Sequence, residues 1–92
     1  MSRGRRARPA KLGLKLKQIR GGLGWSQGEM GERIGCPSEW ARNYVSSYER
    51  NLREPTLPEL LIYSELSGYA INDIVDDRVT LGPVPRNERQ PS

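Results

Sequence analysis

The stretch from Trp25 to Asn51 constrains the fold most, because it predicts two short helices at a steep angle to each other. Ser26 is a favourable N-cap, and Glu29, three residues later, completes a capping-box pattern. Met30 and Ile34 then recur at an i, i+4 spacing, which is typical of one face of an amphipathic helix. The first helix of the pair is therefore predicted to begin directly after Ser26.

Glycine and asparagine mark the close approach and the ends of these two helices. Gly31 lies on the same side as the apolar residues, where the next helix must come close. Gly35 follows the last apolar residue, and glycine tolerates the left-handed conformation that ends a helix. Val45 and Tyr48 are the expected inward pair of the second helix, and Asn51 is its expected left-handed cap.

The ordered motif S-Q-x-x-M-G-x-x-I-G followed by V-S-x-Y-E-R-N resembles the XRE family, the Cro/cI-type helix-turn-helix proteins that include the phage repressors. The likeness extends from about Leu12 to Asp76 and includes the flanking patterns L-x-x-I-R-x-x-L-G and R-E-P-x-L-P-E-L-L. The resemblance implies an all-α, compact five-helix, lambda-repressor-like domain. It also implies a transcriptional regulator, expected to be a repressor, that binds double-stranded DNA as a homodimer on a palindromic operator.

The chain departs from the family pattern in one place. The turn glycine and the inward aliphatic residue are usually six residues apart, whereas Gly35 and Val45 are ten apart. The extra residues, within Cys36 to Ala41, either lengthen the turn or add a turn to the second helix. Ser38 would cap a long helix and Asn43 a shorter one, and Trp40 would pack on the first helix of the pair or join a dimer contact.

The resemblance assigns DNA-contacting roles to residues of the motif. Matched to the family pattern, the base-contacting positions fall on Arg42, Asn43 and Ser47, with Ser46 on the same face. Arginine suits guanine and asparagine suits adenine in the major groove. Phosphate contacts are expected from Ser26, Gln27, Arg50 and Arg53. A plain solvated helix face is the alternative interpretation, but this face carries no acid after Glu39.

Two further roles follow from the family pattern. The resemblance implies a salt bridge between Arg20 and Glu49 that would tie the first helix of the domain to the groove-binding helix. It also implies that Gln27 supports a side chain of that helix. A solvated Arg20 directed at a DNA phosphate is the alternative.

The remaining helices are predicted from apolar periodicity. A first helix over Pro9 to Gly21 buries a stripe and leaves its lysines largely in solvent. The stripe is Leu12, Leu16, Ile19 and Leu23, and the lysines are Lys11, Lys15 and Lys17. A fourth helix, capped by Thr56 and ended by Gly68, buries the wide face of Leu57, Leu60, Leu61, Tyr63 and Leu66. A short fifth helix covers Tyr69 to Val75, and Trp25 is expected in the core.

Charge and composition divide the chain into three parts. Residues 1–20 carry bases and no acid, whereas Glu54 to Asp77 carry acids and no base. We expect a basic flexible N-terminal arm over 1–9, the helix-turn-helix domain over 10–77 and a flexible proline-containing tail over 78–92. The arginines of the arm either contact DNA or form a solubilising tail; they are Arg3, Arg5, Arg6 and Arg8.

Composition argues against several other classes of protein. The 92 residues suffice for one small domain, and no apolar run approaches the roughly 20 residues that span a bilayer. With no histidine and the single cysteine Cys36, neither a zinc site, a disulfide nor a catalytic pair is expected. We therefore expect a cytoplasmic protein that is no enzyme and needs no cofactor or metal. The alternative to a DNA regulator is an antitoxin-like module of the same fold that binds a protein, such as a toxin or a polymerase subunit.

Overall fold

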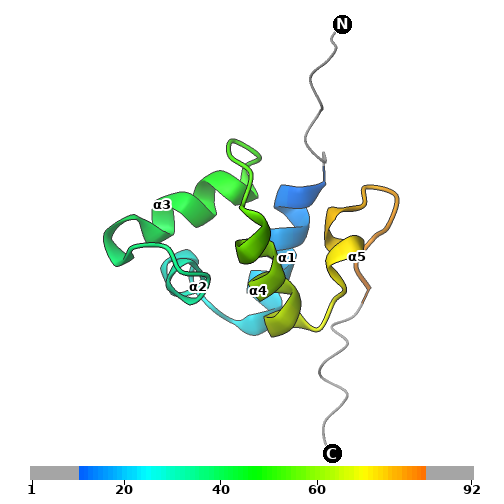
Figure 1. The fold of residues 1–92 in the computed structure, drawn as a ribbon, viewed down its shortest axis with the longest axis horizontal. Coiled ribbons are helices and arrows are strands. Elements are labelled where there is room, and N and C mark those ends of the chain that lie inside the picture. Colours follow the sequence, from blue (N-terminus) through cyan, green and yellow to red (C-terminus); the bar gives the residue numbers. More distant parts are fainter. Residues whose placement is uncertain (1–10, 83–92) are drawn as a thin grey trace, which may run out of the picture.

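A computed structural model describes residues 11–82 of the chain, and these residues form five α-helices without a strand. The helices are α1 (Leu12–Leu23), α2 (Gln27–Arg33), α3 (Ser38–Glu49), α4 (Leu57–Ser67) and α5 (Ile71–Val75). In Figure 1, α2 and α3 form one end of the molecule, α1 and α4 the middle, and α5 the opposite end. The predicted all-α, five-helix fold class is confirmed. No helix within residues 11–82 combines the length and the apolar character needed to cross a bilayer.

Helix α1 extends past its predicted end and buries one residue that was expected in solvent. It continues through Gly21 to Leu23 and ends at Gly24, whose φ of 77° is left-handed. Leu12, Leu16 and Ile19 are buried as predicted, whereas Leu23, the last residue of the predicted stripe, is half-buried.

Lys15 is the error in the prediction for α1, because its side chain is only 3% exposed. Its ammonium group donates hydrogen bonds to the carbonyl oxygens of Asp73 and Asp76, each at 2.7 Å. These carbonyls lie at the end of α5, where unpaired C=O groups and the helix dipole favour a cation. The lysine is buried because this distant helix end lies against α1.

The α2–α3 pair forms as its caps and glycines predict. Ser26 accepts a hydrogen bond from the N–H of Glu29, and the Glu29 carboxylate accepts one from the N–H of Ser26. Gly31 lies directly against α3, because a Cβ at this position would come within 2.6 Å of the Cβ of Ala41. Asn51 ends α3 with a φ of 60°.

The extra residues between the two helices lengthen α3 rather than the turn. Helix α3 begins at Ser38 and has 12 residues, with Pro37 at its N-cap position. Neither of the residues considered as caps, Ser38 and Asn43, has that role. The turn after α2 is held by the N–H of Cys36, which donates to the carbonyl oxygen of Gly31 at 2.9 Å.

Helix α4 buries a narrower face than its sequence predicts. Its capping box, Thr56 with Glu59, is present, and Tyr63 is fully buried. Leu57 and Leu61, however, are 62% and 46% exposed. The reason is that α4 packs against α1 and α5, which cover only one side of it.

The chain after α5 returns to the domain. Leu81 is 6% exposed within the core cluster, and its carbonyl oxygen accepts a hydrogen bond from Gln18. The hydroxyl of Tyr69 donates to the carbonyl oxygen of Gly82. The chain thus packs on the domain through Leu81 and Gly82, where a flexible tail was expected. The arm over 1–9 and the end of the tail lie outside the described residues, so the domain boundaries stay a prediction.

Candidate nucleic-acid interface

Helix α3 has a buried side and a polar side, which together fix how it is presented. Ala41, Val45 and Tyr48 are at most 3% exposed and hold α3 on the core. The five polar residues that the sequence placed on its outward face all retain access to solvent. Arg42, Asn43 and Arg50 are exposed, and Ser46 and Ser47 are half-buried.

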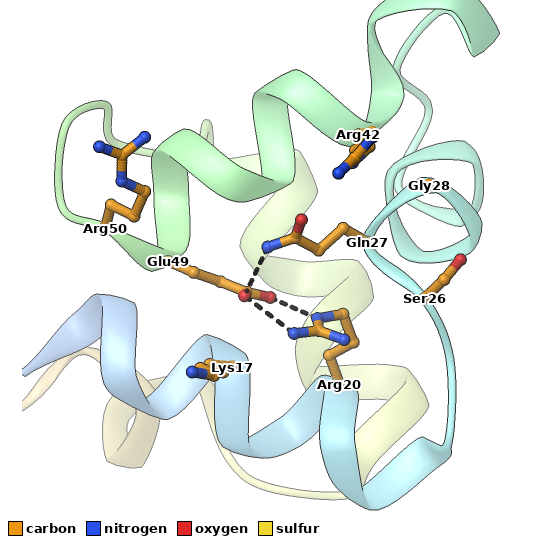
Figure 2. A pocket seen from close by; sticks show the side chains of 8 residues that line it. All are labelled: Lys17, Arg20, Ser26, Gln27, Gly28, Arg42, Glu49 and Arg50. Atoms are coloured by element: carbon orange, nitrogen blue, oxygen red, sulfur yellow. Dashed lines mark hydrogen bonds and ion pairs between the residues drawn. The ribbon is translucent and has the colours of Figure 1, made fainter.

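A hydrogen-bond network around Glu49 joins α3 to α1 and α2 (Figure 2). Arg20 Nε donates to Glu49 Oε2 at 2.6 Å, and Arg20 Nη2 donates to Oε1 at 3.1 Å. Gln27 Nε2 also donates to Oε1, at 3.1 Å. The side chain of Glu49 is only 3% exposed, so these three donors supply the hydrogen bonds that water would otherwise donate to its carboxylate. The residues paired by resemblance, Arg20 and Glu49, are thus in bidentate contact.

The network also holds Arg20 in its charged form. Its hydrogen bonds to Glu49 raise the pKa of Arg20, against the smaller opposing effect of burial. Arg20 Nη1 donates to the carbonyl oxygen of Trp25 at 3.0 Å, which fixes the segment just before α2. Trp25 itself is half-buried rather than fully in the core, with the guanidinium of Arg33 4.4 Å from its ring centroid. Arg20 therefore has its polar groups directed inward and is poorly placed for a phosphate.

An open recess of about 720 Å³ lies over this network, with cations around it. Its lining includes Lys17 from α1, Gln27 at the start of α2, and Arg42 and Arg50 from α3 (Figure 2). The carboxylate of Glu49 is already bound by Arg20 and Gln27, so it does not neutralise the outer cations. The recess is consequently a positively charged hollow that suits an anion.

Lys17 belongs to this recess although the sequence analysis gave it no role. The sequence pattern placed it on the solvent side of α1, and it is indeed exposed. Its position next to α3 was not predicted. A signal was present: Lys17 precedes Arg20 by three residues, so the two share one face of α1. Since Arg20 pairs with α3, a lysine one turn away must also face that helix.

The start of α2 contributes polar groups to the same recess. Ser26 Oγ is bound to the N–H of Glu29, so this cap does not occupy the N–H groups of Gln27 and Gly28. First-turn N–H groups of a helix have no partner inside the helix and attract phosphate oxygens. Ser26, Gln27 and Gly28 all line the recess. The two predicted phosphate contacts at this helix end, Ser26 and Gln27, thus lie beside Arg42.

A second, smaller recess lies on the other flank of α3. It measures about 280 Å³ and is lined by Trp40, Asn43, Tyr44, Ser47 and Arg53. The guanidinium of Arg53 lies 4.9 Å from the centroid of the Tyr44 ring. The predicted phosphate residues Arg50 and Arg53 are therefore separated, one on each flank. The arm residues Arg3, Arg5, Arg6 and Arg8 lie outside the described part of the chain.

Comparison with known proteins identifies the architecture. A family model described as helix-turn-helix matches residues 16–74, which contain α2, α3 and α4. The chain belongs to this helix-turn-helix family. It is an XRE-type member of a family of DNA-binding proteins. No curated protein and no solved structure matches the chain. In this helix-turn-helix, α2 is the supporting helix and α3 occupies the position of the recognition helix.

Proposed function

We propose that this chain is a cytoplasmic, sequence-specific regulator of transcription, a repressor that inserts α3 into the major groove of double-stranded DNA. The observation that carries the proposal is the presentation of α3. Its buried side is fixed on the core, and Glu49 is held by donors from two other helices. A helix held in this way keeps one orientation. Base contacts need this, because they tolerate displacements of the side chains of only about 0.5 Å.

The side chains on α3 divide by the partner that each fits. Arg42 and Asn43 are exposed and have the paired donors and acceptors that match guanine and adenine edges. Ser46 and Ser47 are short enough to hydrogen-bond any base at close approach. Base contacts from these four residues would supply sequence preference.

The cations around α3 fit the DNA backbone. Lys17 and Arg50 line the larger recess, and Arg53 lies at the smaller one. With Ser26 and Gln27 at the start of α2, they would hold phosphates on both sides of the groove. The arm arginines would add contacts along the backbone or in the minor groove. Such contacts set affinity and register and are indifferent to sequence.

The regulator is proposed to act as a homodimer on a palindromic operator. One α3 helix covers only a few base pairs, which is too short a site to be unique. Two copies related by a two-fold axis would contact half-sites about 34–36 Å apart on one face of the duplex. A dimer bound there represses by excluding polymerase from an overlapping promoter.

Selection from a random duplex library at near-physiological salt tests the proposal. The salt matters because basic residues alone bind any DNA in dilute buffer. A two-fold symmetric enriched motif is the expected result, and its half-site spacing reports the dimer geometry. A single ungapped half-site would contradict the homodimer. Absence of enrichment would contradict sequence-specific binding and favour the protein-binding, antitoxin-like alternative.

A further inference from the structure

Trp40 is a large exposed side chain on the turn that the extra residues add to the front of α3. It is 53% exposed, and it lines the smaller recess together with the proposed base contacts Asn43 and Ser47. The proposed base-contacting surface therefore continues without a break onto an indole ring. This continuity distinguishes Trp40 from the other large exposed apolar residues, because none of them lines either recess; they are Leu14, Leu52, Leu57 and Leu61.

Tyr44, which lines the recess beside Trp40, is held in place by its neighbours. Tyr44 follows Trp40 by four residues and so lies on the same side of α3. The Tyr44 ring stacks with that of Tyr48 at a centroid distance of 6.3 Å, and Arg53 covers it at 4.9 Å. Tyr48 is fixed in turn by a 2.7 Å hydrogen bond from its hydroxyl to Glu59. The Tyr44 ring is thus held by Tyr48 and Arg53, and Trp40 and Tyr44 together form the aromatic wall of the recess.

The spacing along α3 indicates which base pair this wall would meet. Trp40 precedes Asn43 by three residues, which corresponds to about 4.5 Å along the helix axis. Neighbouring base pairs of B-DNA are about 3.4 Å apart. A helix lying along the groove would therefore bring Trp40 to the base pair next to the one that Asn43 contacts.

We propose that Trp40, with Tyr44, binds the C5-methyl group of a thymine in the major groove. The inference rests on the proposed function and extends it to a residue to which the family pattern gives no role. Thymine is the base that presents an apolar group in this groove, so an aromatic wall discriminates for it by excluding water. Arg53, the charged member of the recess lining, would lie toward the phosphates of the same strand.

Replacing thymine by deoxyuridine tests this contact, because the change removes the methyl group and keeps every hydrogen-bonding group. Each thymine of the selected operator would be replaced singly, and dissociation constants measured by fluorescence anisotropy. For the wild-type chain, one replacement per half-site should weaken binding about three- to tenfold. Trp40→Ala should bind the thymine operator more weakly and lose this sensitivity, whereas Trp40→Phe should retain part of it.

Leu61→Ala is the matched control, since it also truncates an exposed apolar side chain but on α4. It should keep the wild-type response at every position, and circular dichroism should show all variants folded. Equal sensitivity of wild type and Trp40→Ala to every replacement would overturn the proposal. So would a change in sedimentation mass with Trp40→Ala, which would make the indole a contact between proteins. If the wild-type chain selects no sequence, both the proposed function and this contact are overturned. If it selects an operator but every replacement of thymine by deoxyuridine leaves the dissociation constant unchanged, only the contact is overturned.

Discussion

Gly31 and Ala41 are in backbone contact: a Cβ on Gly31 would lie 2.5 Å from the carbonyl oxygen of Ala41. The Cβ of Ala41 lies at the same place, 2.6 Å from where a Cβ on Gly31 would be. The distance between α2 and α3, and so the projection of α3 from the domain, is set here. The position requires glycine for space and not for an unusual backbone angle.

Gly31→Ala should therefore destabilise the domain, because the neighbouring atoms are the carbonyl group and the Cβ of Ala41, which cannot rotate away. We expect a loss of about 1–3 kcal/mol in the free energy of unfolding, measured by urea denaturation. Gly21→Ala is the control, since nothing lies within 4 Å of a Cβ at that helical position. It should stabilise by about 0.4–1 kcal/mol. Equal effects of the two changes would contradict the close contact.

Arg20→Met should leave the carboxylate of Glu49 largely buried with only Gln27 as a partner. The expected cost is about 3 kcal/mol in unfolding free energy. The double variant Arg20→Met/Glu49→Gln should recover part of that loss, because the uncompensated charge is then gone. Arg78→Ala breaks an exposed ion pair, Arg78–Asp76, in which the arginine side chain is 88% exposed, and should change little. A similar loss from both single changes would argue against burial as the cause.

Tyr63→Phe should be neutral or stabilise the protein, unlike most changes at a fully buried position. The Tyr63 hydroxyl is buried and has no hydrogen-bond partner among the residues that the structure describes. Removing such a group is expected to gain up to about 1 kcal/mol. Tyr48→Phe is the contrast, because it loses the bond to the Glu59 carboxylate and should cost about 1–2 kcal/mol. Thermal unfolding should show a lower Tm for Tyr48→Phe and an unchanged or higher Tm for Tyr63→Phe.

Stability should fall above about pH 10. Burial raises the pKa of Tyr63, and burial together with the hydrogen bond to Glu59 raises that of Tyr48, both above the ordinary value of 10.0. The folded state therefore keeps protons that the unfolded state releases, so this contribution is complete below pH 10 and is lost as pH rises. Each tyrosine adds a slope of about 1.4 kcal/mol per pH unit. Tyr63→Phe should make the unfolding free energy, measured by urea titration, fall less steeply between pH 9 and 12. An unchanged slope would contradict this role of Tyr63.

Arg42→Ala and Arg50→Ala should affect DNA binding in different ways. Loss of Arg42 should relax preference at one position of each half-site by about 1–3 kcal/mol. Loss of Arg50 or Lys17 should weaken all sequences alike and reduce the salt dependence of log K by about one unit. Titrations at several salt concentrations with operator and random duplexes separate the two outcomes. Identical effects on both duplexes would show that the division between base and phosphate contacts is wrong.

Local signals in the sequence were reliable because they depend on residues a turn apart. The capping boxes at Ser26 and Thr56 both form, and Asn51 adopts the left-handed conformation. The need for Gly31 also followed from the pattern, since an apolar face with a glycine in it indicates a close neighbour. The same reasoning did not find Gly13, where a Cβ would lie 2.5 Å from the carbonyl oxygen of Glu49.

Features that depend on distant segments were missed. Lys15 occupies a polar position in the α1 pattern, and nothing near it indicates that the end of α5 will bind its ammonium group. Leu57 and Leu61 read as core because periodicity shows which face is apolar but not how much of it a neighbour covers. The length of α3 was undecidable, since Ser38 and Asn43 are both acceptable caps and the choice depends on packing against α2.

The two halves of α3 differ in how firmly they are tied to the rest of the molecule. Its last two turns are anchored by Val45, Tyr48 and Glu49, whereas its front turns rest chiefly on Ala41 against Gly31. Residues can thus be inserted or deleted ahead of Ala41 while the scaffold behind it stays as it is. For the proposed function, the front of α3 would therefore be the place where base contacts can change without disturbing the scaffold, and Trp40 lies there.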